Sequence, residues 1–232
     1  MTEESEDSSP TALLDLYCST MKENKEFLHR NAEKTYREVI NLINDAINYM
    51  TMAFETKKKE NKVDYVKNPM CFFLHHVLMP QSYAILADLL IGNLPACFME
   101  LRLMLETMAK CHFASLHPNR TLFFEPKLEL LEKQKRSTSK LLEDFGNVIG
   151  LGDKPVALWG KLSNYWVHPR GIVKRVVNEI VEKSDVPSWA WIIPMNYSES
   201  DLDTIKELDK CISQFRSILK ATMKNYEQIT IN

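Results

Sequence analysis

The sequence predicts an all-α protein, an up-and-down bundle of about six to seven helices, from three observations. First, the 232 residues include only 6 glycines, too few for the many tight turns of an all-β fold. Second, long segments repeat apolar residues every three or four positions, which is the period of a helix surface. Third, a polar residue followed by proline recurs where helices are expected to start.

Two helices are predicted in the N-terminal part of the chain. Residues 1–8 are acidic and serine-rich and are expected to be disordered. Ser9 and Pro10 then begin a helix that we follow through Met21. The clearest helix runs from about Ala32 to Lys58, where one apolar stripe continues without a break. The stripe consists of Tyr36, Val39, Ile40, Ile43, Ala46, Ile47, Met50 and Phe54.

Two more helices are predicted in the middle of the chain. Asn68 and Pro69 begin the first, Pro80 is expected to kink or restart it, and Gly92 ends it. The second, over residues 96–116, is apolar on nearly all sides. Such a helix belongs in the centre of its bundle.

The next part of the chain contains an amphipathic helix over about residues 126–145. The glycines at 146, 150 and 152 are expected to break this helix. Asp153 is then expected to cap a short tryptophan-rich helix that ends at His168 and Pro169.

The region before the last helix has an open interpretation. Its residues 171–194 are rich in Val, Ile and Trp and fit either a helix or a short extended or hairpin segment. A last long helix through Tyr226 follows, and both Ser198-x-x-Asp201 and Ser200-x-x-Asp203 offer a capping box for its start. The sequence therefore predicts one helical bundle domain over residues 9–232.

Composition and charge limit the functional classes. The net charge of -2 and the pI of about 6.3 are unlike those of a strongly basic nucleic-acid-binding protein. The five cysteines are scattered without a CxxC spacing, which is typical of buried thiols in a reducing compartment. The N-terminus is acidic rather than basic, and the apolar runs are shorter than ~18 residues. We expect a cytoplasmic protein without a membrane segment.

No cofactor and no metal ion are predicted. The sequence has no phosphate-binding glycine loop, no HExxH and no GxSxG motif. Cys71 and His75 are four residues apart on a predicted helix, but nothing near them in the sequence completes a zinc site.

Three residues stand out as candidates for chemistry. Arg102 and Glu106 lie one turn apart on the most apolar helix, where a charge is costly unless it is paired. They form either an ion pair at the edge of the core or an interior polar site. His168 ends the tryptophan-rich helix, where the helix dipole favours its protonated form, and a nearby Glu106 would act in the same direction.

Two segments resemble a known family. Residues 93–108, which carry Arg102 and Glu106, and residues 161–169 (Lys-Leu-Ser-Asn-Tyr-Trp-Val-His-Pro) are similar to a group of uncharacterised microbial helical proteins. These proteins resemble the HEPN superfamily of helical bundles, whose motif is an arginine, usually a polar residue, and a histidine. In this chain His168 matches the histidine and Asn164 the polar residue, but Ser163 occupies the arginine position.

The resemblance implies a function. It implies a metal-independent RNase or RNA-binding protein of a defence or toxin-like system, acting as a homodimer. His168 would serve in proton transfer, Arg102 would contact phosphate, and Glu106 would orient one of them. Ser163 departs from the motif because serine cannot supply a fixed positive charge.

Two other functions remain open. In one, the chain is a non-catalytic interaction or scaffold protein with a protein partner, and Arg102, Glu106 and His168 form a structural cluster. In the other, the four tryptophans line a pocket for a small ligand, although clustered tryptophans are more often part of a core. Their positions are Trp159, Trp166, Trp189 and Trp191.

Overall fold

The described part of the chain is predominantly α-helical, as predicted. The computed structural model describes residues 10–57, 68–116, 124–133, 137–164 and 194–231, and no strand occurs among them. The helices are α1 (Pro10–Asn31), α2 (Glu33–Lys57), α4 (Pro69–Phe73), α5 (Met79–Leu90), α6 (Leu94–Ser115), α7 (Phe124–Lys133), α8 (Thr138–Val148), α9 (Lys154–Leu162) and α11 (Leu202–Ile231). The expected disorder of residues 1–8 lies outside the described residues.

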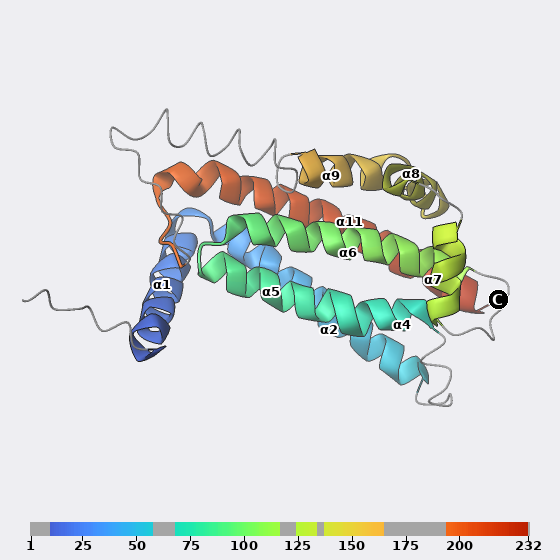
Figure 1. Cartoon of the computed structure of the whole chain (residues 1–232), viewed down its shortest axis with the longest axis horizontal. Coiled ribbons are helices and arrows are strands. Elements are labelled where there is room, and N and C mark those ends of the chain that lie inside the picture. Colours follow the sequence, from blue (N-terminus) through green and yellow to red (C-terminus); the bar gives the residue numbers. More distant parts are fainter. Residues whose placement is uncertain (1–9, 58–67, 117–123, 134–136, 165–193, 232) are drawn as a thin grey trace, which may run out of the picture.

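Helix α6 is the centre of the bundle, which confirms the prediction from its nearly uniform apolarity. It contacts α4, α5, α7, α8, α9 and α11. Figure 1 shows α5, α6 and α11 side by side along the long axis, with α8 and α9 above them and α1 across one end. Half of its 22 residues are buried, among them Phe98, Leu101, Met104, Leu105 and Met108.

The two N-terminal helices form where the sequence predicts them. Helix α2 spans Glu33–Lys57, within a residue of the expected bounds at either end. Helix α1 begins at Pro10 as predicted but continues to Asn31, ten residues past Met21. The C-terminal half of α1 is held by Asn24, whose amide nitrogen donates to the carbonyls of Leu90 and Met195 at 2.9 Å each. A fully buried polar side chain thus joins α1, α5 and the segment before α11.

A new helix begins at Pro80, as predicted: α5 starts at Met79 with Pro80 in its first turn, and a widened turn precedes it. Asn68 caps α4 as predicted, because its Oδ1 accepts hydrogen bonds from the backbone nitrogens of Met70 and Cys71. Between α4 and α5 lies one π-helical turn, η1 (Leu74–Leu78), in which the Met79 nitrogen donates to the Leu74 carbonyl. A proline ring collides with the carbonyl four residues before it, and the wider turn relieves that collision.

The turn between α5 and α6 confirms Gly92 as the end of a helix. Gly92 has φ +82°, and a Cβ placed on it would lie 2.1 Å from the carbonyl oxygen of Met195. The Met195 nitrogen also donates to the Ile91 carbonyl at 2.9 Å. Glycine is therefore required here both by its backbone conformation and by the close approach of a second segment.

Residues 126–145 form two helices, so the prediction of one helix is wrong. Ser137 has an extended backbone, and its hydroxyl accepts a hydrogen bond from the Lys140 nitrogen at the start of α8. Gly146 does not break α8, which continues to Val148. A Cβ at Gly146 would lie 1.8 Å from the Gly152 carbonyl oxygen, so this glycine permits a close backbone approach. Gly150 and Gly152, both with positive φ, form the turn after the helix.

The caps predicted for the last two helices differ: one does not form and the other does. Asp153 precedes α9, but its side chain makes no capping hydrogen bond; its backbone carbonyl accepts from the Ala157 nitrogen instead. Ser198 and Asp201 form the predicted capping box, which leads through the 3-10 turn η3 (Glu199–Asp201) into α11. The alternative helix or extended segment over residues 171–194 falls almost wholly outside the described residues.

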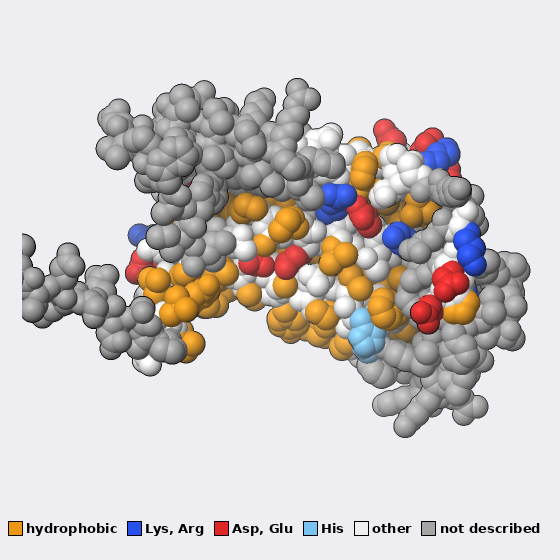
Figure 2. Space-filling model, viewed as in Figure 1, with side chains coloured by type: hydrophobic (Ala, Val, Ile, Leu, Met, Phe, Trp, Pro, Cys, Tyr) orange, Lys and Arg blue, Asp and Glu red, His pale blue; other side chains and the backbone are white. Residues whose placement is uncertain are grey.

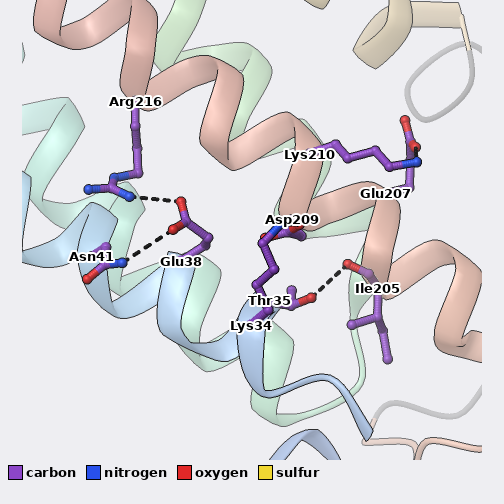
Figure 3. Close-up of polar contacts among 9 residues, drawn as sticks. All are labelled: Lys34, Thr35, Glu38, Asn41, Ile205, Glu207, Asp209, Lys210 and Arg216. Carbon is purple, nitrogen blue, oxygen red and sulfur yellow. Dashed lines mark hydrogen bonds and ion pairs between the residues drawn. The ribbon is translucent and has the colours of Figure 1, made fainter.

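Polar contacts join α2 to α11 (Figure 3). Lys34 Nζ lies 2.6 Å from Asp209 Oδ2, and Thr35 Oγ1 donates to the Ile205 carbonyl at 3.2 Å. One turn further along, Arg216 Nη1 lies 2.8 Å from Glu38 Oε2. Ion pairs of opposite charge thus join α2 and α11 at two levels.

Among the described residues one helical run, Pro69–Leu90, is long and apolar enough to cross a membrane by length and composition alone. Its mean hydropathy is 1.2 over the most apolar 18-residue window. Core helices of soluble proteins meet the same criterion. Here α5, the longest helix of this run, packs against α6 and α2.

Candidate functional site

Arg102 and Glu106 form the predicted ion pair on α6. Arg102 Nε lies 2.8 Å from Glu106 Oε1, and the two side chains are 23% and 25% exposed. The one-turn spacing along an α-helix brings such side chains together. The pair is therefore partly shielded from water and lies at the edge of the core, as expected from the sequence.

Trp159 of α9 completes this cluster, and the sequence did not predict that contact. Its indole Nε1 donates to Glu106 Oε1 at 2.6 Å, the same oxygen that binds Arg102. The Arg102 guanidinium also lies 5.6 Å from the centre of the Trp159 ring, within the range of a cation–π contact. The Arg102–Glu106–Trp159 cluster thus fastens α9 to α6.

Of the other two predicted site residues, the structure describes only Asn164. Asn164 is exposed just after the end of α9. His168 lies outside the described residues, as do Trp166, Trp189 and Trp191, so the predicted meeting of His168 with Glu106 stays a prediction. The serine at the motif's arginine position, Ser163, is only 1% exposed.

A second ion pair holds α9 from its other side. Lys161 pairs with Glu207 of α11, and Glu207 is also approached by Lys210. Helix α9 is therefore fixed to α6 through Trp159 and to α11 through Lys161. These contacts explain why a short helix with few buried residues has a defined place in the bundle.

Asp88 of α5 and Glu100 of α6 form a pair of carboxyl groups that the sequence analysis missed. Burial raises the pKa of Glu100 to about 8, and the charge of Asp88 and the hydrogen bond between the two groups act in the same direction. Burial also raises the pKa of Asp88, although the amide of Asn93 donates to Asp88 Oδ1 at 2.8 Å. The pair is therefore expected to share one proton near neutral pH. Within the described residues, no basic side chain forms an ion pair with either carboxyl group.

His112 is a buried titratable group on the opposite end of α6. Its Nε2 lies 2.9 Å from Asn225 Oδ1 of α11, and the Asn225 amide nitrogen donates to the Val148 carbonyl of α8. Nε2 must therefore carry the proton, because the Asn225 oxygen can only accept. Burial lowers the pKa of His112 to about 4, so the side chain is neutral at pH 7. This contact joins α6, α8 and α11.

The cysteines are free thiols, and four of the five are buried, as the sequence suggested. Burial raises the pKa of Cys111 and of Cys211 to about 12. Such thiols are poor nucleophiles and poor metal ligands at neutral pH. In the described residues no group of three or more His, Cys, Asp or Glu side chains is placed to hold a metal ion.

No protein-family model, no curated protein and no solved structure matches this chain. Its resemblance to HEPN proteins therefore rests on the two short segments alone.

Proposed function

We propose that this chain is a non-catalytic helical interaction protein in which Arg102, Glu106 and Trp159 are structural. One observation carries the proposal: Glu106 Oε1 accepts hydrogen bonds from both Arg102 Nε and Trp159 Nε1. The carboxylate is thus used to bind two protein donors on two helices. A general base needs its oxygen directed at a substrate proton, and a phosphate-binding arginine needs a charge that is not already neutralised.

The burial of Ser163 supports the same proposal. Active HEPN RNases place an arginine at this position to meet a phosphate. A side chain that is 1% exposed does not face a substrate-sized opening, and serine carries no charge. The departure from the motif therefore concerns both the residue type and its environment.

The first test of this proposal is Glu106→Gln. The substitution leaves the partly buried Arg102 without a counter-ion, so we expect a loss of ~1–3 kcal/mol in the free energy of unfolding. Urea unfolding followed by circular dichroism measures this. The matched control is Glu33→Gln, which removes an i,i+4 pair with Arg37 whose side chains are more than half exposed. That control should cost less than ~0.5 kcal/mol, and equal losses in the two variants would contradict a structural role for Glu106.

RNA binding or cleavage is the second candidate function. It is favoured by the free side of Arg102, whose Nη groups have no hydrogen-bond partner among the described residues, since its ion pair uses Nε. In this reading Arg102 contacts phosphate, Asn164 and His168 complete the HEPN motif, and a homodimer pairs two motifs.

One assay separates the two candidates. Labelled single-stranded RNA is incubated with wild type, His168→Ala and Arg102→Ala, without added metal. The interaction proposal predicts no cleavage that distinguishes wild type from either variant. Cleavage by wild type that both variants lose would refute it and establish the RNase.

A further inference from the structure

The face formed by α5 and α6 exposes large apolar side chains. Tyr83 on α5 is 48% exposed, and Met99 and Leu103 on α6 are 46% and 47% exposed. Figure 2 shows hydrophobic side chains gathered over these two helices, with acidic side chains among them. We call the surface around Tyr83, Met99 and Leu103 the α5–α6 face. A cluster of exposed apolar side chains on one face of a bundle is typical of a contact surface.

The carboxyl pair lies within this face. Glu100 follows Met99 and precedes Leu103 by less than one turn of α6, and Asp88 of α5 lies close enough to raise the pKa of Glu100. The two carboxyl groups therefore bridge the two helices between the exposed apolar side chains. Neither residue is fully buried, although Glu100 Oε2 is shielded from solvent and has no hydrogen-bond partner among the described residues.

The pair differs from the other interhelical acids of the bundle in having no cation. Glu38 and Asp45 share Arg216, Asp209 pairs with Lys34, and Glu207 pairs with Lys161. Among the described residues, Asp88 and Glu100 have only each other and the amide of Asn93. Two adjacent carboxyl groups repel each other when both are ionised, and a basic group between them would remove that repulsion.

We propose that the α5–α6 face binds an amphipathic helix of another protein that carries a lysine or arginine within its apolar stripe. The apolar side chains of that helix would pack on Tyr83, Met99 and Leu103, and its basic group would lie between Asp88 and Glu100. This inference rests on the proposed interaction function and names its partner.

Charge complementarity selects this occupant over two others. In a two-fold dimer the same patch meets itself, so a second copy centred on this face would bring further carboxyl groups toward the pair. A lipid surface would have to accept two carboxyl groups within its apolar part, which is costly. An amphipathic helix with a basic residue can pack on the exposed apolar side chains and also pair with the two carboxyl groups.

The test uses a displayed library of 16-residue amphipathic helices selected on the folded wild-type chain. The apolar stripe is fixed as leucine, and its central position is varied among Arg, Lys, Gln, Glu and Leu. We expect selection of Arg or Lys at that position. Binding of a selected peptide should weaken at least tenfold with Leu103→Glu and with the double variant Asp88→Asn/Glu100→Gln. Val148→Glu, which alters an exposed apolar side chain of α8, is the control and should bind as wild type does.

Four outcomes would overturn the proposal. Selected peptides without a basic residue would show that the face does not select a cation. Unchanged binding of the selected peptides to Leu103→Glu would show that they do not bind the α5–α6 face. Sedimentation that reveals a dimer, dissociated by Leu103→Glu, would assign the face to a second copy. Binding to phosphatidylcholine vesicles that Leu103→Glu abolishes would assign it to a membrane. None of these results depends on RNA cleavage, so this proposal and the non-catalytic assignment fail separately.

Discussion

Replacing Glu100 with glutamine should stabilise the protein, and only at neutral and alkaline pH. The folded-state pKa of Glu100, about 8, lies above its usual value of 4.5. The folded protein therefore holds a proton that the unfolded chain releases, and stability falls as the pH rises from 4.5 to 8. Glutamine resembles the protonated carboxyl group in shape and stays neutral at every pH. The variant should thus match wild type at pH 4.5 and exceed it at pH 8.

The size of the effect follows from the pKa change. At ~1.4 kcal/mol per pH unit, the change bounds the stabilisation at ~5 kcal/mol. Glu100 is only about half buried, so solvent screening reduces the expected value to ~1–2 kcal/mol at pH 8. For a domain of this size that corresponds to a rise of ~2–8 °C in Tm.

Thermal unfolding of wild type and Glu100→Gln between pH 4.5 and pH 8.5 measures the difference. Asp88→Asn should give a similar gain, and the double variant should gain less than the sum, because either change removes the repulsion. Glu33→Gln is the control, since its ion pair with Arg37 is exposed. A Glu100→Gln variant that is destabilised at pH 8, or stabilised equally at pH 4.5 and pH 8, would refute the reasoning.

Two further predictions concern a buried histidine and a glycine. The folded-state pKa of His112, about 4, lies below its usual 6.5, so its contribution to stability is intact above pH 6.5 and is lost as the pH falls toward 4. In His112→Gln, the free energy of unfolding measured in urea should not show this decrease between pH 6.5 and pH 4. A decrease equal to that of wild type would contradict the low pKa of His112. Gly92→Ala should cost roughly 2–4 kcal/mol, because it adds backbone strain at φ +82° and displaces the Met195 carbonyl. Gly150→Ala shares the positive φ but meets no atom, so it should cost only ~1 kcal/mol, and equal Tm losses would exclude the contact with Met195.

The helices could be predicted because their signals are local. The stripe of α2, the cap at Asn68 and the stop at Gly92 each depend on residues within a few positions of each other. The wrong predictions concern residues whose role depends on contacts with residues distant in the sequence. Gly146 appeared to be a helix breaker, but it is needed for the approach of Gly152, which only the folded chain reveals.

The candidate site could be predicted only in part, for the same reason. The Arg102–Glu106 pair follows from a spacing of four residues on one helix. Trp159 lies more than fifty positions away, and nothing in its surroundings indicates that its indole donates to Glu106. Asp88 and Glu100 were missed because they are on different helices and meet only when α5 folds back on α6. Carboxyl groups with ordinary neighbours in sequence acquire unusual properties through tertiary contact.

The two acidic sites on α6 lead to opposite expectations for mutation, and this contrast argues for different roles. Glu106 has two donors and a matched charge, so removing its charge should weaken the fold. Glu100 has a second carboxyl group beside it and no cation among the described residues, so removing its charge should strengthen the isolated fold. A group that destabilises the free protein is retained most easily when a bound partner restores the balance of charge. We therefore expect Glu100, on the α5–α6 face, to contact a bound partner, and Glu106 to stabilise the fold.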